Sequence, residues 1–269
     1  MPKLSKILIF PIKSLDPIAV NAVKISSGGA LQGDREFAIF DCNGKYINAK
    51  RYPKIHLIRA NYNSAYNSGD RLVHLSIQDQ KNQNQADVVT FHLDRDRQAL
   101  TNWFSEFFGQ PVELRQNNIN GFPDDPDAWG ATIISEATLA KVQSWYTNPP
   151  LSLEQLRLRF RTNLEITDSA PFWEDSLFAK SDATFPFQIG DVQFLGTNPC
   201  QRCPVPTRDP FTGEIYPEFS KIFAQQREAN LPINVERSRF NHFYRLALNT
   251  RIPLTESGKI LKIGDSVCK

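Results

Sequence analysis

The sequence predicts a mixed, β-rich fold with a few helices, and three observations support this class. Short β-branched and aromatic runs recur over residues 1–115, separated by turn-forming Gly, Asn, Ser and Asp residues. Helical spacing of apolar residues occurs in only a few stretches. Strands and helices do not alternate in the βαβ order that a parallel α/β sheet requires. A chain of 269 residues is long enough for one large domain or two smaller ones.

The expected strands lie mainly in the N-terminal part of the chain. The Asn43-Gly44 pair, between residues 37–41 and 45–49, predicts a tight hairpin, and Phe185–Leu195 predicts another around Gly190-Asp191. The polar run Gln80–Asp87 is interpreted as a solvated hairpin tip. Four short β-rich runs are expected as strands: Ile7–Phe10, Phe37–Phe40, Leu72–Ile77 and Val88–Leu93.

Two segments have the apolar spacing of amphipathic helices. Arg95–Phe108 is one, and its aromatic stripe is interpreted as core. Ser135–Tyr146 is the other, with Ser135 as N-cap. Leu151–Arg161 is consistent with either helix or extended chain. Asn117–Gly130 contains a run of Pro-Asp and Asp-Pro steps and is interpreted as a linker, which divides the chain into residues 1–118 and 119–269.

Composition excludes several classes of protein. Hydrophobic residues make up 41% and charged residues 22% of the chain, as in ordinary globular proteins. The formal net charge of +2 gives no global electrostatic case for binding nucleic acid or an anionic membrane. No apolar stretch approaches the roughly 18 residues of a membrane span, and the N-terminus lacks a signal-peptide pattern. We therefore expect a soluble, cytoplasmic protein.

The most informative motif is Cys200-Gln201-Arg202-Cys203, which contains two of the four cysteines. The prolines that follow it indicate a constrained loop. A thiolate is a soft metal ligand, and a neighbouring arginine favours the charged thiolate, so Arg202 suits a metal-binding Cys203. Three other interpretations stay open: half of a zinc site, a thioredoxin-like redox pair, and two merely buried thiols.

Several cationic residues could bind an anionic ligand, although each also has a structural interpretation. Lys13 and Ser14 follow an expected strand, where a phosphate contact or a solvated strand end would fit. Arg35 follows Asp34 and could bind phosphate or form an ion pair. Three arginines alternate at 157, 159 and 161, so on a strand they would share one face. No P-loop, GxGxxG, GxSxG or HExxH motif is present.

Taken in order, nine segments resemble the MOSC family. They run PIKS, GDREFAIF, ISEATL, FRTN, PFWEDS, FQIGDV, CQRC, DPFTG and KIGD, and they span residues 11–265. The resemblance implies a β-barrel MOSC domain with flanking helices, preceded by an N-terminal β-barrel-like domain, as in the amidoxime-reducing members. Two departures are Thr162, where close relatives tend to have proline, and Gln201, where a small residue is common.

The resemblance implies a molybdenum–molybdopterin cofactor whose metal is bound by Cys203. Matching by motif places Gln201 and Arg202 beside the metal site and Asn163 close by in the FRTN segment. It assigns the phosphate and pyran side of the pterin to four residues: Lys13, Ser14, Arg35 and Arg161. Asp209 is a candidate proton donor, although a turn-forming aspartate before Pro210 fits as well. The family is also described by the broad term pyridoxal phosphate binding.

The resemblance further implies an oxidoreductase that reduces small N-hydroxylated compounds. Because no iron–sulfur domain with its cysteines is visible, electrons are expected from a separate protein: a ferredoxin, a flavodoxin, or a cytochrome b5-like protein with its reductase. Two alternatives stay open. One is a non-catalytic carrier of the molybdenum cofactor, and the other is a sulfur carrier with a persulfide on Cys203.

Overall fold

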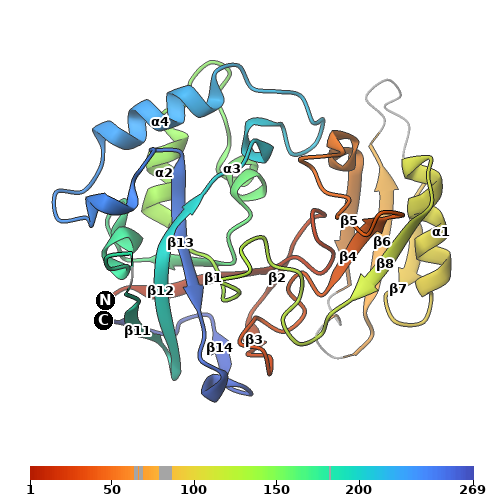
Figure 1. Ribbon diagram of the computed structural model, residues 1–269, viewed down its shortest axis with the longest axis horizontal. Coiled ribbons are helices and arrows are strands. Elements are labelled where there is room, and N and C mark those ends of the chain that lie inside the picture. The colour runs from red at the N-terminus through yellow and green to blue at the C-terminus, as the bar shows by residue number, and fades with distance from the viewer. Residues whose placement is uncertain (64–65, 67–68, 79–86, 182) are drawn as a thin grey trace.

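The computed structural model describes residues 1–63, 66, 69–78, 87–181 and 183–269, and it is rich in strands (Figure 1). Figure 1 shows α2 (Glu136–Gln143) and α4 (Phe219–Ala229) beside β12 and β13 in one part of the molecule. The other part contains α1 (Arg97–Phe108) with β4 to β8, and β2 and β3 lie between the two. The β-rich, mixed class expected from the sequence is confirmed.

The largest sheet has eight strands and is mixed. Its neighbours pair antiparallel except β9 and β10, which are parallel. The described strands leave this sheet with two edges, β15 and β2, so a closed barrel, which the family resemblance implied, is not found among the described residues. In spatial order the strands are β15 (Val267–Cys268), β11 (Phe185–Ile189), β12 (Val192–Gln201), β13 (Arg245–Arg251), β9 (Ile133–Ser135), β10 (Leu164–Thr167), β1 (Lys3–Ile9) and β2 (Ile18–Val20).

Three smaller sheets complete the described structure. One joins β3 and β14, a second joins β4 and β8, and a third contains β5, β6 and β7. Their strands are β3 (Ala22–Lys24), β4 (Phe37–Asp41), β5 (Ile58–Tyr62), β6 (Leu72–Ile77), β7 (Val89–His92), β8 (Val112–Gln116) and β14 (Ile260–Lys262). The described 3₁₀ turns are Pro53–Leu57, Trp173–Leu177, Val205–Thr207, Arg237–Arg239 and Leu254–Glu256.

The predicted helices are confirmed, with local reasons for their ends. Helix α1 buries Leu100 and Phe104 and stops at Gly109, which adopts the left-handed conformation. The side chain of Ser135 accepts a hydrogen bond from the backbone N–H of Thr138 and so caps α2. Leu151–Arg161, for which the sequence left two possibilities, contains helix α3 (Leu153–Phe160), and a capping box starts it.

The structure refines two sequence expectations about local structure. The tight turn expected at Asn43-Gly44 is present: the chain returns antiparallel to β4 through an isolated bridge between Phe40 and Tyr46 and a hydrogen bond from the backbone N–H of Ile47 to the carbonyl of Ile39 at 2.8 Å, although residues 45–49 form no regular strand. The arginines at 157, 159 and 161 do not share one face, because they lie on and just after a helix. On a helix, side chains two positions apart in the sequence point in directions that differ by about 200°. The hairpin tip expected at Gln80–Asp87 lies outside the described residues, except for Asp87.

The core explains why the two parts of the chain hold together. One apolar cluster extends from Ile7 to Phe104 and Phe194, so it joins residues from both sides of the expected linker. A second cluster packs α2, α3 and α4 together. Strand β1 belongs to the sheet built mostly from the second half of the chain, while the division at residue 118 stays a prediction. Among the described residues, no helix has the length and apolarity to cross a membrane.

Candidate functional site

A cavity of about 1270 Å³ lies where segments from the whole chain meet. Its walls come from the turn after β1, the linker before β9, the end of α3, the end of β12, and β13. Eleven lysines and arginines line it against five aspartates. This excess of positive charge favours an anionic ligand.

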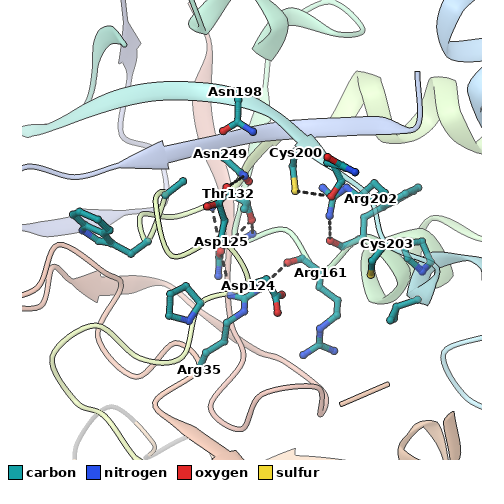
Figure 2. A pocket seen from close by; sticks show the side chains of 18 of the residues that line it. Arg35, Asp124, Asp125, Thr132, Arg161, Asn198, Cys200, Arg202, Cys203 and Asn249 are labelled. Atoms are coloured by element: carbon teal, nitrogen blue, oxygen red, sulfur yellow. Dashed lines mark hydrogen bonds between the residues drawn. The ribbon is translucent and has the colours of Figure 1, made fainter. Parts of the chain in front are cut away.

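Three cations cluster at this wall: Lys13 and Arg35, which are buried, and Arg161, which is half-buried. Figure 2 shows Arg35 and Arg161. The Nζ of Lys13 donates a hydrogen bond of 2.9 Å to the carbonyl of Phe122 and pairs with Asp124. Arg35 and Arg161 have left-handed backbones, with φ of 48° and 52°. Since non-glycine residues adopt this conformation at a cost, both side chains are held in place by the surrounding structure.

Hydrogen bonds lock the arginines together. Arg161 donates to the carbonyl of Leu15 at 2.7 Å, and Arg35 donates to the backbone carbonyl of Arg161 at 3.2 Å. Arg35 also pairs with Asp34, so the ion pair expected as its structural role is present in the same side chain that lines the cavity. The cluster is therefore preorganised, which reduces the entropy lost when a ligand binds.

Burial and mutual repulsion shape the pKa values in this cluster. Burial lowers the pKa of Lys13, and burial together with Arg35 lowers the pKa of Arg161 to about 10. For Asp124, whose side chain is exposed to the cavity, partial desolvation by the cavity walls opposes the charged carboxylate, but Lys13, Arg35 and Arg161 outweigh this effect and lower its pKa to about 2. Arg35, Arg161 and Asp124 are thus charged near neutral pH, and the contact with Asp124 favours the charged form of Lys13.

Two further predicted residues lie at this wall. Ser14 lines the cavity in a left-handed turn with φ of 73°. The side chain of Asn163 is buried: its Oδ1 accepts hydrogen bonds from the N–H and hydroxyl of Thr132, and its Nδ2 donates to the carbonyl of Leu8 at 3.0 Å. Asn163 therefore fixes the wall through its neighbours.

The Cys-Gln-Arg-Cys motif begins at the end of β12 and continues into the cavity. Cys200 and Gln201 are the last residues of the strand, and Cys203 lies in the turn that follows. The thiol-bearing residue Cys203 is exposed and lines the cavity. Burial raises the pKa of the Cys200 thiol, and the nearby Arg202 only partly offsets this effect. Cys203 is thus the accessible cysteine of the pair.

Arg202 fixes the turn after β12 through three hydrogen bonds, which together form the Arg202 clip. Its guanidinium donates to the carbonyl of Leu246 from Nε at 3.1 Å and from Nη2 at 2.6 Å. It also donates to the carbonyl of Phe160 from Nη1 at 2.9 Å. These bonds tie the turn to β13 and to the end of α3, which fixes the direction in which Cys203 leaves the strand.

The structure weighs against the other interpretations of the motif. In the described part of the chain, no group of three or more His, Cys, Asp or Glu side chains gathers as a metal site, which disfavours zinc. The motif lies at a strand end and not at the start of a helix, unlike a thioredoxin-like pair. The exposure of Cys203 excludes two buried thiols.

Asp209 lies outside the set of residues that line the cavity. Its Oδ1 accepts hydrogen bonds from the backbone N–H groups of Phe211 and Thr212, and its Oδ2 accepts from Gln155. This is the turn-forming role that the sequence left as the alternative to proton donation.

Comparison with known proteins agrees with this architecture. Residues 1–111 match the family model described as the MOSC N-terminal beta barrel domain, and residues 130–267 match the MOSC domain. The chain belongs to the MOSC family. Among curated relatives, the molybdenum cofactor sulfurase of Drosophila erecta is 30% identical over 263 residues, which cover 87% of this chain and 31% of that protein.

Two other MOSC relatives show the same relation. The molybdenum cofactor sulfurase of Danio rerio is 25% identical over 303 residues, covering 99% of this chain and 35% of that protein. The sulfurase of Oryza sativa is 25% identical over 235 residues, covering 74% and 27%. The chain spans about a third of the length of the curated relatives it matches.

The cavity of this MOSC chain also contains residues that sequence reasoning did not assign. Asp124 and Asp125 come from the linker, and Asn249 of β13 donates to Asp125 at 3.0 Å. His56 also lines the cavity, and burial together with Arg161 and other arginines lowers its pKa to about 4. The Pro-Asp run over Asp124 and Asp125 was the one available signal, and from the sequence it was interpreted only as a linker.

Proposed function

We propose that this chain binds a molybdenum–molybdopterin cofactor and reduces small N-hydroxylated compounds with electrons from a separate donor protein. One observation carries the proposal: an exposed cysteine, Cys203, shares a cavity with eleven cationic and five anionic side chains. A phosphorylated pterin needs cations, and a heavy redox metal prefers a thiolate. The residues present therefore fit the cofactor.

The roles follow from the geometry of the wall. Lys13, Arg35 and Arg161 would hold the anionic phosphate end, with Ser14 beside them. Cys203 would ligate the metal, and Gln201 flanks it at the strand end. The residues that keep these groups in place are Arg202, through its backbone carbonyl contacts, and Asn163, through Thr132.

Bound in this cavity, the cofactor would supply the two-electron redox chemistry that reduction of an N–OH group requires. The overall reaction converts the N–OH compound, two electrons and two protons into the N–H compound and water. The protein binds and orients both partners, and its cationic wall stabilises negative charge in a cavity partly screened from water. The electron donor is proposed as a ferredoxin, a flavodoxin, or a cytochrome b5-like protein with its reductase.

The first test is the substitution Cys203→Ser, with Cys200→Ser as the matched control in the same motif. Protein from a molybdate-supplied host that makes the cofactor is assayed for molybdenum and for the fluorescent oxidation product of the pterin. We expect Cys203→Ser to lose molybdenum, since the thiolate ligand is gone, while Cys200→Ser retains it. Full molybdenum content in Cys203→Ser would contradict the ligand assignment.

A second candidate function is a carrier that binds the cofactor without turnover, because the curated relatives are named cofactor sulfurases. Loaded protein with a reductase and an electron carrier distinguishes the two functions. Turnover of an N-hydroxylated substrate supports the reductase, whereas stable cofactor without turnover supports the carrier. A persulfide on Cys203 in protein that lacks molybdenum would instead indicate a sulfur carrier.

A further inference from the structure

The anion-binding cluster already contains an anion from the chain itself. Asp124 of the linker pairs with Lys13, and its charge interacts with Arg35 and Arg161. Figure 2 shows the side chain of Asp124 between those of Arg35 and Arg161. The carboxylate therefore occupies the position that the phosphate group of a ligand would need.

The two side chains of the Lys13–Asp124 ion pair differ in how freely they can move. The side chain of Lys13 is 5% exposed, and the carbonyl of Phe122 also holds its ammonium group. The side chain of Asp124 is 77% exposed, so it can swing aside without opening a packed core. The cations are fixed, and the anion is the exchangeable partner.

The linker around Asp124 is anchored independently of this pair. The backbone N–H of Phe122 donates to Arg35 at 2.8 Å, and that of Gly130 donates to Thr250 at 2.9 Å. Asp125 is held by Asn249. Loss of the Asp124 contact would therefore leave the linker attached at both ends.

We propose that Asp124 is an internal competitor for the phosphate subsite, which a phosphate-bearing ligand displaces from Lys13 when it binds. This inference rests on the anion subsite of the proposed function but not on molybdenum or on catalysis. In the empty protein Asp124 neutralises part of a cluster of three like charges, whose mutual repulsion would otherwise destabilise it. Asp124 also sets a minimum affinity for ligands at this subsite, because only an anion that binds the three cations more strongly than the Asp124 carboxylate replaces it.

The test measures binding of inorganic phosphate to the full chain, produced without cofactor, by titration calorimetry at mildly alkaline pH. Three proteins are compared: the wild type, Asp124→Asn, and Asp125→Asn. The last is the matched control, since it removes one negative charge from the same cavity without touching Lys13. We expect Asp124→Asn to bind phosphate about tenfold more tightly, the order of one lost competing charge-assisted hydrogen bond, and Asp125→Asn to bind like the wild type.

Chemical rescue gives a second, independent readout. In Asp124→Ala the vacated position can accept a free carboxylate, so formate should raise the melting temperature of this variant and leave that of the wild type unchanged. Formate should also compete with phosphate in the variant. A purely structural role of Asp124 would produce no such competition.

Three results would overturn the inference. If the wild type binds phosphate and Asp124→Asn binds it equally or more weakly, Asp124 does not compete with phosphate. The phosphate subsite itself is then still supported. An equal gain in Asp125→Asn shows a general charge effect and not displacement. Absence of phosphate binding in all three folded proteins removes the subsite as well, and with it the phosphate contacts of the proposed function.

Discussion

The clip formed by Arg202 makes a quantitative prediction. Arg202→Ala removes three donated hydrogen bonds and leaves the carbonyls of Leu246 and Phe160 without these partners. Hydrogen bonds to a charged group contribute about 1.5–3 kcal/mol each, so the two carbonyls at the lower end give a loss of about 3 kcal/mol. In a chain of this size about 1 kcal/mol shifts the melting temperature by about 2–4 °C, which predicts a fall of roughly 6–12 °C.

The assay is thermal unfolding followed by circular dichroism, with Arg202→Lys as the control that keeps the charge. Lysine can satisfy one carbonyl but not both in the fork geometry, so we expect roughly half the loss. A second readout is the alkylation rate of Cys200 in a Cys203→Ser background. Arg202 lowers the pKa of Cys200, so its removal should slow alkylation at a given pH. An unchanged melting temperature in Arg202→Ala would refute the clip.

The remaining predictions concern the buried ion pair between Arg227 and Asp175 and the neighbouring Glu174. Arg227 is fully buried and pairs with Asp175, so Arg227→Met should lower the free energy of unfolding by about 3–5 kcal/mol in urea titrations, and Asp175→Asn should restore part of it. A double variant no more stable than Arg227→Met would contradict the pairing. Burial and the neighbouring Asp175 raise the pKa of Glu174 from 4.5 to about 8, so the folded state retains a proton that the unfolded chain releases. The free energy of unfolding should therefore fall as pH rises through this window, and Glu174→Gln should flatten the slope; parallel pH profiles would exclude Glu174 as the cause.

Local patterns predicted several strands and helices, most clearly those with one buried and one exposed face. Leu72–Ile77 forms a strand with the predicted bounds, and helix α1 differs from its prediction by two residues at the start. Strand β13 (Arg245–Arg251) was not predicted: it is buried on both faces, so it lacks the alternation that marks a half-exposed strand. Helix α4 (Phe219–Ala229) was also missed, because its buried residues are sparse between polar positions.

In the candidate site too, some residues could be predicted from the sequence and others could not. Lys13, Arg35 and Arg161 could be proposed from the sequence, because cations near strand ends and the family motifs pointed to the same positions, and the structure brings them together. Asp124 and Asn249 could not, because their places in the cavity depend on how segments more than a hundred residues apart pack. An aspartate in a proline-rich linker has the same sequence signature whether it is solvated or paired with a buried lysine.

The position of β1 has a consequence for how the protein is made. This strand lies between β10 and β2, and the backbone N–H of Val267 donates to the carbonyl of Pro2 at 2.9 Å. The residues of β1 therefore wait for one partner until residue 164 is synthesised and for another until residue 267. During that interval β1 has an unpaired edge and exposed apolar residues, the condition in which nascent chains aggregate or recruit chaperones. The interval in which β1 lacks these partners thus lengthens when translation slows.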